Sequence, residues 1–511
     1  MNLEATNSLV DELLADQQRL TAVERFSQFH ENASEPVQAK HYHNLIPLTQ
    51  PGSGEQYSFE VDLEACSGCK ACVTACHSLN GLDEGESWRE VGTLTTLDQV
   101  PATIQTVTSA CHHCADPACA NGCPTLAYEK ESDTGVVRHL DDQCIGCQYC
   151  TMTCPYEVPK YNARLGIVRK CDMCQSRLQE GEAPACVQAC PNEAIRIRII
   201  TTVKIEENAA YQVSLLPGTA PSSITKPSTT FLNLRKPANA SIVSADNEDL
   251  SPAHGHTPLA VMLVLTQVAS GLFLFDALSR FTSMGPAALP LWHAIFAAAF
   301  AIAGLTCATF HLGRPFQAWR SFLGWRKSWL SREILIFGIW SGMAIAYVGC
   351  LALKLPPLIQ ATVALGTVAT GLLGVFCSVM VYVFTKRPFW SLTQTGPRFF
   401  LTATALGACF TFPAITAIAT GLKLALEIRV SSQRITPFKK SAKILAGPLR
   451  KAWGIRLVNG MTGTFLSLLA VSNPSLAPLA FLFILSGELI ARHLYFRAVE
   501  VPKMPGGVPS K

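Results

Sequence analysis

Long apolar stretches follow one another from about residue 257 onward, separated by short polar segments. Most reach the roughly 20 residues that an α-helix needs to cross a bilayer. Buried core helices of a soluble protein are the alternative, but so many apolar helices in succession would have no polar shell around them. The pattern therefore predicts an all-α, multi-pass membrane bundle over residues 257–500. Its stretches cover 259–279, 288–311, 333–353, 358–385, 399–426, 457–472 and 476–496.

The number of spans stays open because of one stretch, 399–426, which contains Pro413. It forms either one long helix or two short helices joined by a tight turn, so the bundle has seven or eight helices. The two counts place the C-terminal tail, residues 501–511, on opposite sides of the membrane.

The N-terminal extension, residues 1–56, has apolar positions between 9 and 23 at roughly helical spacing. It is predicted to be partly helical and to pack either on its own domain or on a partner subunit. Acidic residues interrupt what would be the apolar segment of a signal peptide, and no twin-arginine pair is present. Residues 201–256 are rich in Pro, Ser, Thr, Asn and Ala without periodicity, which predicts a linker along the domain surface.

Between these segments, residues 57–200 hold sixteen of the chain's twenty cysteines in four groups of four. Each group opens with C-x-x-C and closes with C-x-x-x-C, and three groups end in Cys-Pro. This is the pattern of a two-cluster bacterial ferredoxin, present twice. It predicts an α+β ferredoxin-like domain with two pseudo-repeated double-cluster halves. The groups are Cys66, Cys69, Cys72 and Cys76; Cys111, Cys114, Cys119 and Cys123; Cys144, Cys147, Cys150 and Cys154; and Cys171, Cys174, Cys186 and Cys190.

Disulfides and structural zinc are the alternatives for so many cysteines. Zinc sites usually consist of two C-x-x-C pairs, whereas three cysteines in one tight run with a fourth before proline are typical of iron–sulfur ligation. Four [4Fe–4S] clusters are therefore predicted, and such a series conducts single electrons. In two-cluster ferredoxins the fourth cysteine of a run binds the other cluster, but this local rule does not tell which runs pair.

Both halves of the sequence resemble subunits of the dimethyl sulfoxide reductase family of molybdoenzymes. The segments CSGCKACVTAC, CHHCADPACANGCP, CIGCQYCTMTCPYEVPKYN and KCDMCQSRLQEGEAPACVQACP resemble its iron–sulfur subunit. The segments HLGRPFQAW, SWLSREI, GPRFFLT and GELIARHLYFR resemble its membrane anchor subunit. These subunits are usually separate polypeptides, and here they appear as a fusion that covers nearly all of residues 57–500. The N-terminal extension and the shortened stretch after Phe399 depart from the family pattern.

The resemblance implies that the first cysteine run pairs with the fourth and the second with the third. It also implies a separate molybdopterin-containing catalytic subunit, and an anchor that oxidises quinol from the membrane pool and holds no haem. The implied ligand sets are Cys66, Cys69, Cys72 and Cys190 for cluster 1; Cys76, Cys171, Cys174 and Cys186 for cluster 2; Cys111, Cys114, Cys119 and Cys154 for cluster 3; and Cys123, Cys144, Cys147 and Cys150 for cluster 4.

The predicted quinol site centres on His311, at the end of the second span, because an imidazole accepts a hydrogen bond and then a proton near neutral pH. The family's quinol histidine occupies the matching motif. The loop between the second and third stretches contains Trp319, Trp325 and Trp329. Arg314 and Glu333 lie at the two ends of this loop, on the same side of the membrane. Interfacial anchoring is the alternative for Arg314 and for Arg332.

Other charged residues within the spans or near their ends must pair or face a cavity. Glu488 and Arg492 are four residues apart, so a structural ion pair is predicted, and Asp276 needs a partner of its own. Only His293, His311 and His493 lie within spans or at their ends, so no haem is expected. The isolated cysteines at 307, 350, 377 and 409 are interpreted as small core residues.

The distribution of basic residues predicts the orientation. Loops on the side of the ferredoxin domain hold eight Lys or Arg residues, and the opposite short loops hold Arg280 and Lys354. The domain is thus expected in the cytoplasm, with the bundle in the inner membrane. The net charge of +4 gives no indication of a nucleic-acid partner. The eight residues are Arg314, Arg320, Arg326, Lys327, Arg332, Lys386, Arg387 and Arg398.

The sequence thus predicts an electron-transfer and anchor subunit that oxidises quinol and passes electrons through four clusters to a molybdopterin-containing reductase subunit. It would hold the quinol site but not the terminal reductase site. Electron flow from an oxidising partner into quinone is one alternative, and a non-catalytic redox sensor or assembly scaffold is another. The terminal substrate and the quinone type stay open.

Overall fold

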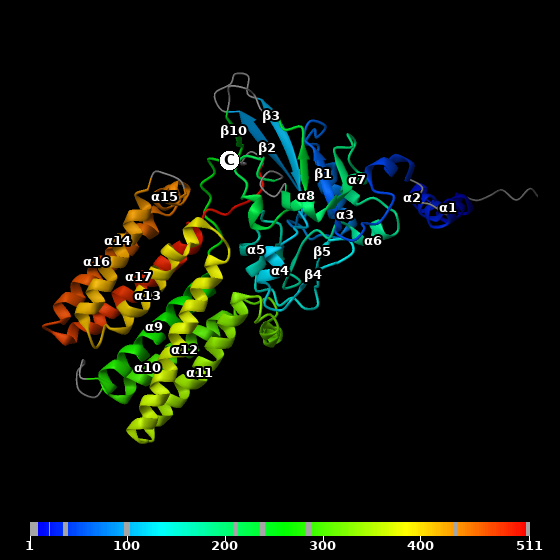
Figure 1. Ribbon diagram of the computed structural model, residues 1–511. Helices are drawn as coiled ribbons and strands as arrows, with labels where there is room; N and C mark the ends of the chain where they lie inside the picture. The colour runs from blue at the N-terminus through cyan, green and yellow to red at the C-terminus, as the bar shows by residue number, and fades with distance from the viewer. Residues whose placement is uncertain are drawn as a thin grey trace, which may run out of the picture.

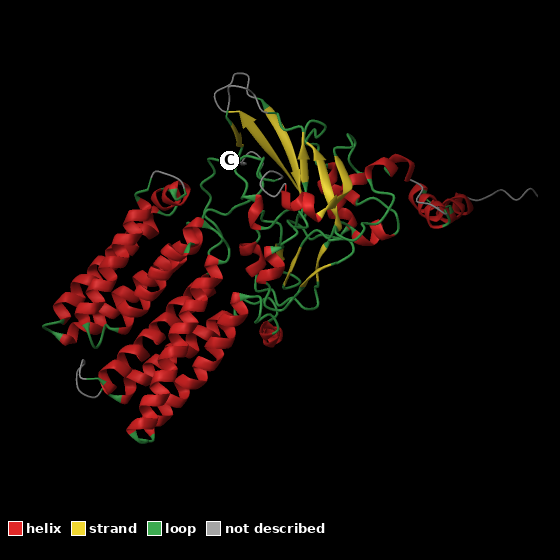
Figure 2. Ribbon diagram, viewed as in Figure 1, coloured by secondary structure: helices red, strands yellow, loops and turns green. Residues whose placement is uncertain are grey.

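The computed structural model describes residues 9–19, 21–33, 39–96, 103–207, 213–235, 241–282, 289–433 and 437–506. Figure 1 shows two bodies, a sheet-containing N-terminal half and a bundle of long helices, which meet at one end of the bundle. Figure 2 shows that the strands are confined to the first body and that the second is helical. The predicted fold classes of the two halves are therefore both present.

The N-terminal half is built on two three-stranded sheets. In the first, β1 (Glu55–Asp62) lies between β8 (Ile195–Thr201), to which it is antiparallel, and β9 (Thr230–Leu232), to which it is parallel. In the second, β2 (Glu90–Thr96) lies between β3 (Ile104–Ser109) and β10 (Ile242–Ser244). Apolar residues alternate along β1 and β8, so one face of the first sheet lies over a core. The segment predicted as a linker over 201–256 supplies β9 and β10, so it completes both sheets instead of only connecting two domains.

Short helices lie within the cysteine runs and pair as a pseudo-repeat. Helix α3 (Ala71–Leu79) packs against α7 (Ala185–Gln188), and α4 (Ala118–Gly122) packs against α5 (Tyr149–Thr153). The remaining elements are α6 (Gln175–Gln179), α8 (Thr202–Glu207), the hairpin of β4 (Tyr128–Lys130) and β5 (Val137–His139), and the hairpin of β6 (Lys160–Asn162) and β7 (Ile167–Arg169).

The bundle begins with α9 (Thr257–Phe281), α10 (Leu291–Thr309), α11 (Trp329–Ala352) and α12 (Pro357–Val383). It continues with α13 (Leu392–Gly407), α14 (Pro413–Ser431), the short α15 (Lys439–Ala446), α16 (Arg450–Ala470) and α17 (Ala477–Arg497). Among the described residues, five segments are long and apolar enough to cross a membrane: α9 to α12 and residues 474–497. The protein is therefore a multi-pass membrane protein. The ambiguous stretch 399–426 contains the end of one helix, at Gly407, and the start of a second helix, at Pro413.

The N-terminal extension contains α1 (Leu9–Gln18) and α2 (Ala22–Glu31), which project from the end of the first body that is farthest from the bundle (Figure 1). No residue of α2 is buried, and Phe29 is 65% exposed. An ion pair of 3.0 Å between His30 and Glu182 connects α2 to the domain. In the described part of the extension, α2 thus contacts its own domain through this ion pair without burying an apolar face.

Candidate functional site

The structure gathers the sixteen cysteines of the four runs into four sets. One small pocket is lined by Cys66, Cys69, Cys72 and Cys190. In a second set, burial raises the pKa of Cys76 to about 12, and the neighbouring thiols Cys186 and Cys174 contribute to this shift. Cys171 lies within electrostatic range of Cys76 and Cys174, which completes the set.

The remaining eight cysteines form a third and a fourth set. Cys119 lies within electrostatic range of Cys111, Cys114 and Cys154. Cys150 lies within the same range of Cys147, Cys144 and Cys123. Each set therefore takes three thiols from one run and its fourth from another, because α3 packs on α7 and α4 on α5.

The surroundings of these thiols fit iron–sulfur clusters. Backbone N–H groups donate to cysteine sulfurs, for example from Ala127 to Cys123 over 3.3 Å and from Gly146 to Cys144 over 3.4 Å. Hydrogen bonds of this kind stabilise and tune cluster thiolates. All twenty cysteines are free thiols. The cysteine sets thus have the chemistry that iron–sulfur clusters require.

Two buried cations lie between the cysteine sets. Arg89 is 2% exposed and lies within electrostatic range of cysteines of sets one and two. Lys170 is 3% exposed and donates to the Cys111 sulfur over 3.5 Å. Although burial opposes it, the sulfurs of Cys111, Cys119 and Cys171 raise the pKa of Lys170. Both cations are therefore charged and offset the negative charge of neighbouring thiolates.

The fourth cysteine set lies where the two bodies dock. The backbone N–H of Arg314 donates to the carbonyl of Ile145 over 3.1 Å, and that of Gly324 donates to the carbonyl of Pro124 over 2.8 Å. A Cβ at Gly313 would lie 2.1 Å from the carbonyl oxygen of Gly166, so only glycine permits this close approach. The loop between α10 and α11 is thus held directly against the segments that contain Cys123 and Cys144.

A cavity of about 290 Å³ lies at this junction, between the fourth cysteine set and helices α9 to α12. Its lining is mostly apolar and includes Cys147 and Tyr149 from the ferredoxin half. His311 and Glu333, both predicted as quinol-site residues, line it from the bundle. The structure therefore brings a cysteine of the fourth set, an imidazole and a carboxyl group to one apolar chamber.

His311 follows α10, and its ring lies close to the backbone of Cys147. Its Nε2 atom is buried and has no hydrogen-bond partner in the described part of the protein. Burial, with a smaller contribution from the neighbouring His254, lowers the pKa of His311 to about 4. The ring is thus neutral at pH 7 and can accept a hydrogen bond from a hydroxyl group in the cavity.

Glu333 is 3% exposed and accepts a hydrogen bond from the Ser378 hydroxyl of α12. Arg314, the third predicted quinol-site residue, does not line the cavity. Its guanidinium donates to the backbone carbonyl of Asp141 over 2.8 Å, so it holds the ferredoxin half against the loop. The prediction placed Arg314 in the site because sequence proximity to His311 does not fix the direction of its side chain.

Arg332 has the anchoring geometry that was predicted as its alternative role. Its guanidinium lies 4.4 Å from the ring centroid of Trp329 and donates to the carbonyls of Trp325 and Arg326. Sequence reasoning missed Tyr149, Ser378 and Tyr382 around the cavity. Tyr149 sits inside a cysteine run, and the other two lie in an apolar helix, so no local pattern distinguishes them from core residues.

The buried charges of the bundle pair differently from the prediction. Glu488 contacts Lys423 and accepts from Arg456 over 2.9 Å, whereas Arg492 donates to Gln267 over 2.8 Å. The predicted Glu488–Arg492 ion pair was therefore wrong, because partners from α14 and α16 approach the carboxylate more closely. Asp276 is paired with Arg280, His293 and Tyr347 at the opposite end of the bundle.

Comparisons with known proteins agree with this arrangement. Residues 102–199 match the family model of the 4Fe-4S dicluster domain, and residues 253–436 match that of the DMSO reductase anchor subunit (DmsC). One polypeptide of the anaerobic dimethyl sulfoxide reductase of Haemophilus influenzae is 37% identical over 184 residues, which cover 34% of this protein and 87% of that relative.

Two further relatives belong to other systems. The hydrogenase-2 operon protein HybA of Escherichia coli O157:H7 is 34% identical over 183 residues, which are 31% of this protein and 55% of that relative. The thiosulfate reductase electron transfer subunit PhsB of Salmonella typhi is 37% identical over 145 residues, which are 28% of this protein and 74% of that relative.

Proposed function

This chain belongs to the dimethyl sulfoxide reductase family, as a fusion of its iron–sulfur and membrane anchor subunits, and on this premise we propose that it oxidises quinol and delivers the electrons to a molybdopterin-containing catalytic subunit. The observation that carries the proposal is the cavity shared by His311, Glu333 and Cys147. A quinol bound there would touch a residue of the fourth cysteine set. Its hydroxyl protons would meet a neutral imidazole and a carboxyl group.

Each of the four cysteine sets is assigned one [4Fe–4S] cluster, with the ligands that the family resemblance implies. The clusters, when bound, supply one-electron carriers. The order of the sets supports a linear path that starts at the membrane. Tyr128 lies within electrostatic range of cysteines of sets four and three, Lys170 lies beside cysteines of sets three and two, and Arg89 lies beside cysteines of sets two and one.

The exposure of the first cysteine set supports a position of the catalytic subunit beside that set. Cys69 is exposed, unlike the buried Cys150 of the fourth set. A partner that takes electrons must approach the cluster at one end of the path. Set four lies at the end beside the quinol cavity, so set one is the end that remains for the partner. The ferredoxin-like domain is similar both to a subunit of a dimethyl sulfoxide reductase and to a subunit of a thiosulfate reductase, so the terminal substrate stays open. The similarity to the hydrogenase-2 operon protein favours a second candidate function, in which electrons flow in the reverse direction, from an oxidising partner into quinone.

The cluster assignment predicts about sixteen iron atoms and about sixteen acid-labile sulfides per polypeptide, because each of four cubanes contributes four of each. Metal and sulfide analysis of the purified, full-length protein measures both numbers. Replacement of Cys119 by Ser removes one ligand of set three and is expected to lower both. Stoichiometric zinc with little iron would contradict the assignment.

We further propose eight membrane crossings, by α9 to α14, α16 and α17. The C-terminal residues return to the ferredoxin half, where the Thr93 N–H donates to the carbonyl of Gly506 over 3.0 Å and Met504 Sδ lies 3.3 Å from Nε2 of His112. Since the polypeptide also enters the bundle from this half, the number of crossings is even. Eight crossings place the basic segment around α15 on the ferredoxin side, which supports a cytoplasmic domain in an inner-membrane protein.

This orientation predicts that residues 57–200 are protected in intact cells. Protease added to inverted membrane vesicles should cleave the domain, whereas protease added to cells with a permeabilised outer membrane should not. A cysteine introduced at Leu353, in the loop between α11 and α12, is the matched control and should be labelled only from outside. Cleavage of the domain from the outside would show that the opposite orientation holds.

A further inference from the structure

Three histidines lie in a row where the polypeptide enters the bundle. The ring centroids of His311 and His256 are 5.1 Å apart, and those of His256 and His254 are 4.6 Å apart. Both pairs meet edge to face. His256 precedes the first residue of α9, and His254 lies two residues before it, so the two rings come from the segment that joins the ferredoxin half to the bundle.

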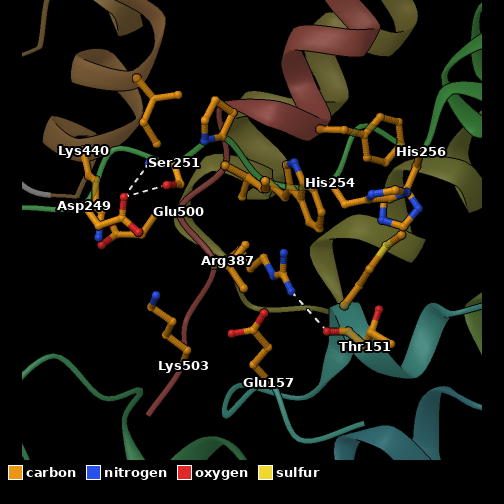
Figure 3. A pocket seen from close by; sticks show the side chains of 18 of the residues that line it. Thr151, Glu157, Asp249, Ser251, His254, His256, Arg387, Lys440, Glu500 and Lys503 are labelled. Atoms are coloured by element: carbon orange, nitrogen blue, oxygen red, sulfur yellow. Dashed lines mark hydrogen bonds between the residues drawn. The ribbon is translucent and has the colours of Figure 1, made fainter. Parts of the chain in front are cut away.

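The row connects two cavities. His311 lines the proposed quinol cavity, whereas His256 and His254 line a second cavity of about 380 Å³. The second cavity lies between the ferredoxin half, the segment before α9 and the C-terminal residues. In Figure 3 the Arg387 side chain lies between the two histidines and Glu157.

Within the second cavity, exposure increases from His256 to His254. His256 is buried, whereas His254, Glu157 and Glu500 are exposed. The polar wall of this cavity therefore reaches water, while the quinol cavity is lined mostly by apolar groups. A proton released in the quinol cavity needs a series of polar groups to reach solvent, because hydrocarbon side chains cannot transmit it.

His256 and His311 each have a ring nitrogen that is available for proton transfer. His256 Nδ1, like His311 Nε2, is buried and has no hydrogen-bond partner among the described residues. An imidazole can take a proton on one nitrogen and release another proton from its second nitrogen, so it passes a proton without moving far. Buried polar groups are normally hydrogen-bonded, and unpaired ones of this kind are often found where a protein has a functional need for them.

We propose that His256 and His254 conduct protons from the quinol cavity to the solvent through the second cavity. This inference rests on the proposed quinol site. Oxidation of one quinol breaks two O–H bonds and yields a quinone, two electrons and two protons. The thiols of the fourth cysteine set would hold the cluster that accepts the two electrons one at a time, and the protons pass along the histidine row to water on the ferredoxin side. Electrons and protons leave toward the same side, so this step moves no net charge across the membrane.

The test compares two histidine variants in membranes that contain the full-length protein. His256→Phe keeps the ring volume and removes both nitrogens, so it is expected to slow menadiol-driven reduction of the clusters roughly tenfold or more. Reduction of the same clusters by dithionite should be unchanged, because it requires no proton exit. His493→Phe is the matched control: the His493 ring contacts the same segment beside Gly255 but lines neither cavity.

Two further readouts separate proton transfer from packing. Added imidazole should restore the rate of His256→Ala, because it can enter the space of the lost ring from the second cavity. The rate of His256→Phe should also fall further in D₂O than that of the wild type, because proton exit has become limiting. Equal slowing of His256→Phe and His493→Phe, or slowing without rescue and without the D₂O effect, would overturn the inference.

The outcome also distinguishes this inference from the proposed function. If wild-type membranes fail to reduce the clusters with menadiol, the quinol site itself is wrong. If the wild type reduces them and His256→Phe does so at the same rate, the quinol site stands and the histidine row does not conduct protons.

Discussion

His311→Phe is expected to slow quinol-driven reduction of the clusters by roughly a hundredfold or more, the usual scale for losing a general base. The phenyl ring keeps the bulk of the imidazole but cannot accept a hydroxyl proton. The side chain lines the same cavity as Cys147, so the loss should occur in the step that separates protons from electrons. Stopped-flow measurement of cluster reduction by menadiol in membranes gives the rate.

The matched control is Arg314→Lys. Arg314 follows His311 closely in the sequence, but its guanidinium contacts Asp141 and not the cavity. Lysine keeps its charge and its long stem, so the rate should stay within a few-fold of the wild type. Cluster EPR spectra and protein abundance should be unchanged in both variants. A normal rate for His311→Phe would move the proton acceptor elsewhere, and Glu333→Gln would then be the next variant to measure.

The second large effect is expected for Arg456→Ala, in the buried ion network of the bundle. Arg456 is fully buried and contacts Glu427 over 3.0 Å and Glu488 over 2.9 Å. Removing one partner of a buried ion pair typically costs about 3–5 kcal/mol, because the remaining charge stays desolvated and uncompensated. Lys423 remains beside Glu488, so the lower end of this range is expected.

Thermal inactivation of the detergent-solubilised protein, followed by loss of helical circular dichroism, measures this change. Lys451→Ala, an exposed residue of the same helix, should leave the transition within about 0.5 kcal/mol of the wild type. Arg456→Lys keeps the charge and should lie between the two. If Arg456→Ala unfolds at the wild-type temperature, the network does not stabilise the packing of α14, α16 and α17.

Local sequence patterns were sufficient for the cysteine chemistry and for most helices. The spacing within each cysteine run depends only on neighbouring residues, so the cluster type follows from the sequence. Apolar length likewise indicates a membrane helix, because the solvation of the segment itself decides its location. The pattern 399–426 was compatible with one helix or two, since a proline at the first turn of a helix and a proline inside one look alike in sequence.

Long-range contacts could not be obtained in this way. The pairing of the cysteine runs was known from resemblance alone, and the structure relates it to the packing of α3 on α7 and of α4 on α5. Arg314 and Glu488 were assigned the wrong neighbours because proximity along a helix or loop was the only guide. The strands β9 and β10 were hidden in a segment without periodicity, since three residues are too few to show alternation.

The sequence by itself thus determined the metal-binding chemistry and the membrane character, because each depends on residue types at short spacing, and its resemblance to two known subunits indicated their fusion. The tertiary structure alone decided which residues meet. It placed Cys147, His311 and Glu333 around one cavity, and it aligned His311, His256 and His254 between that cavity and a second one. Most of these contacts join segments far apart in the sequence, and they form only when both bodies have folded and docked.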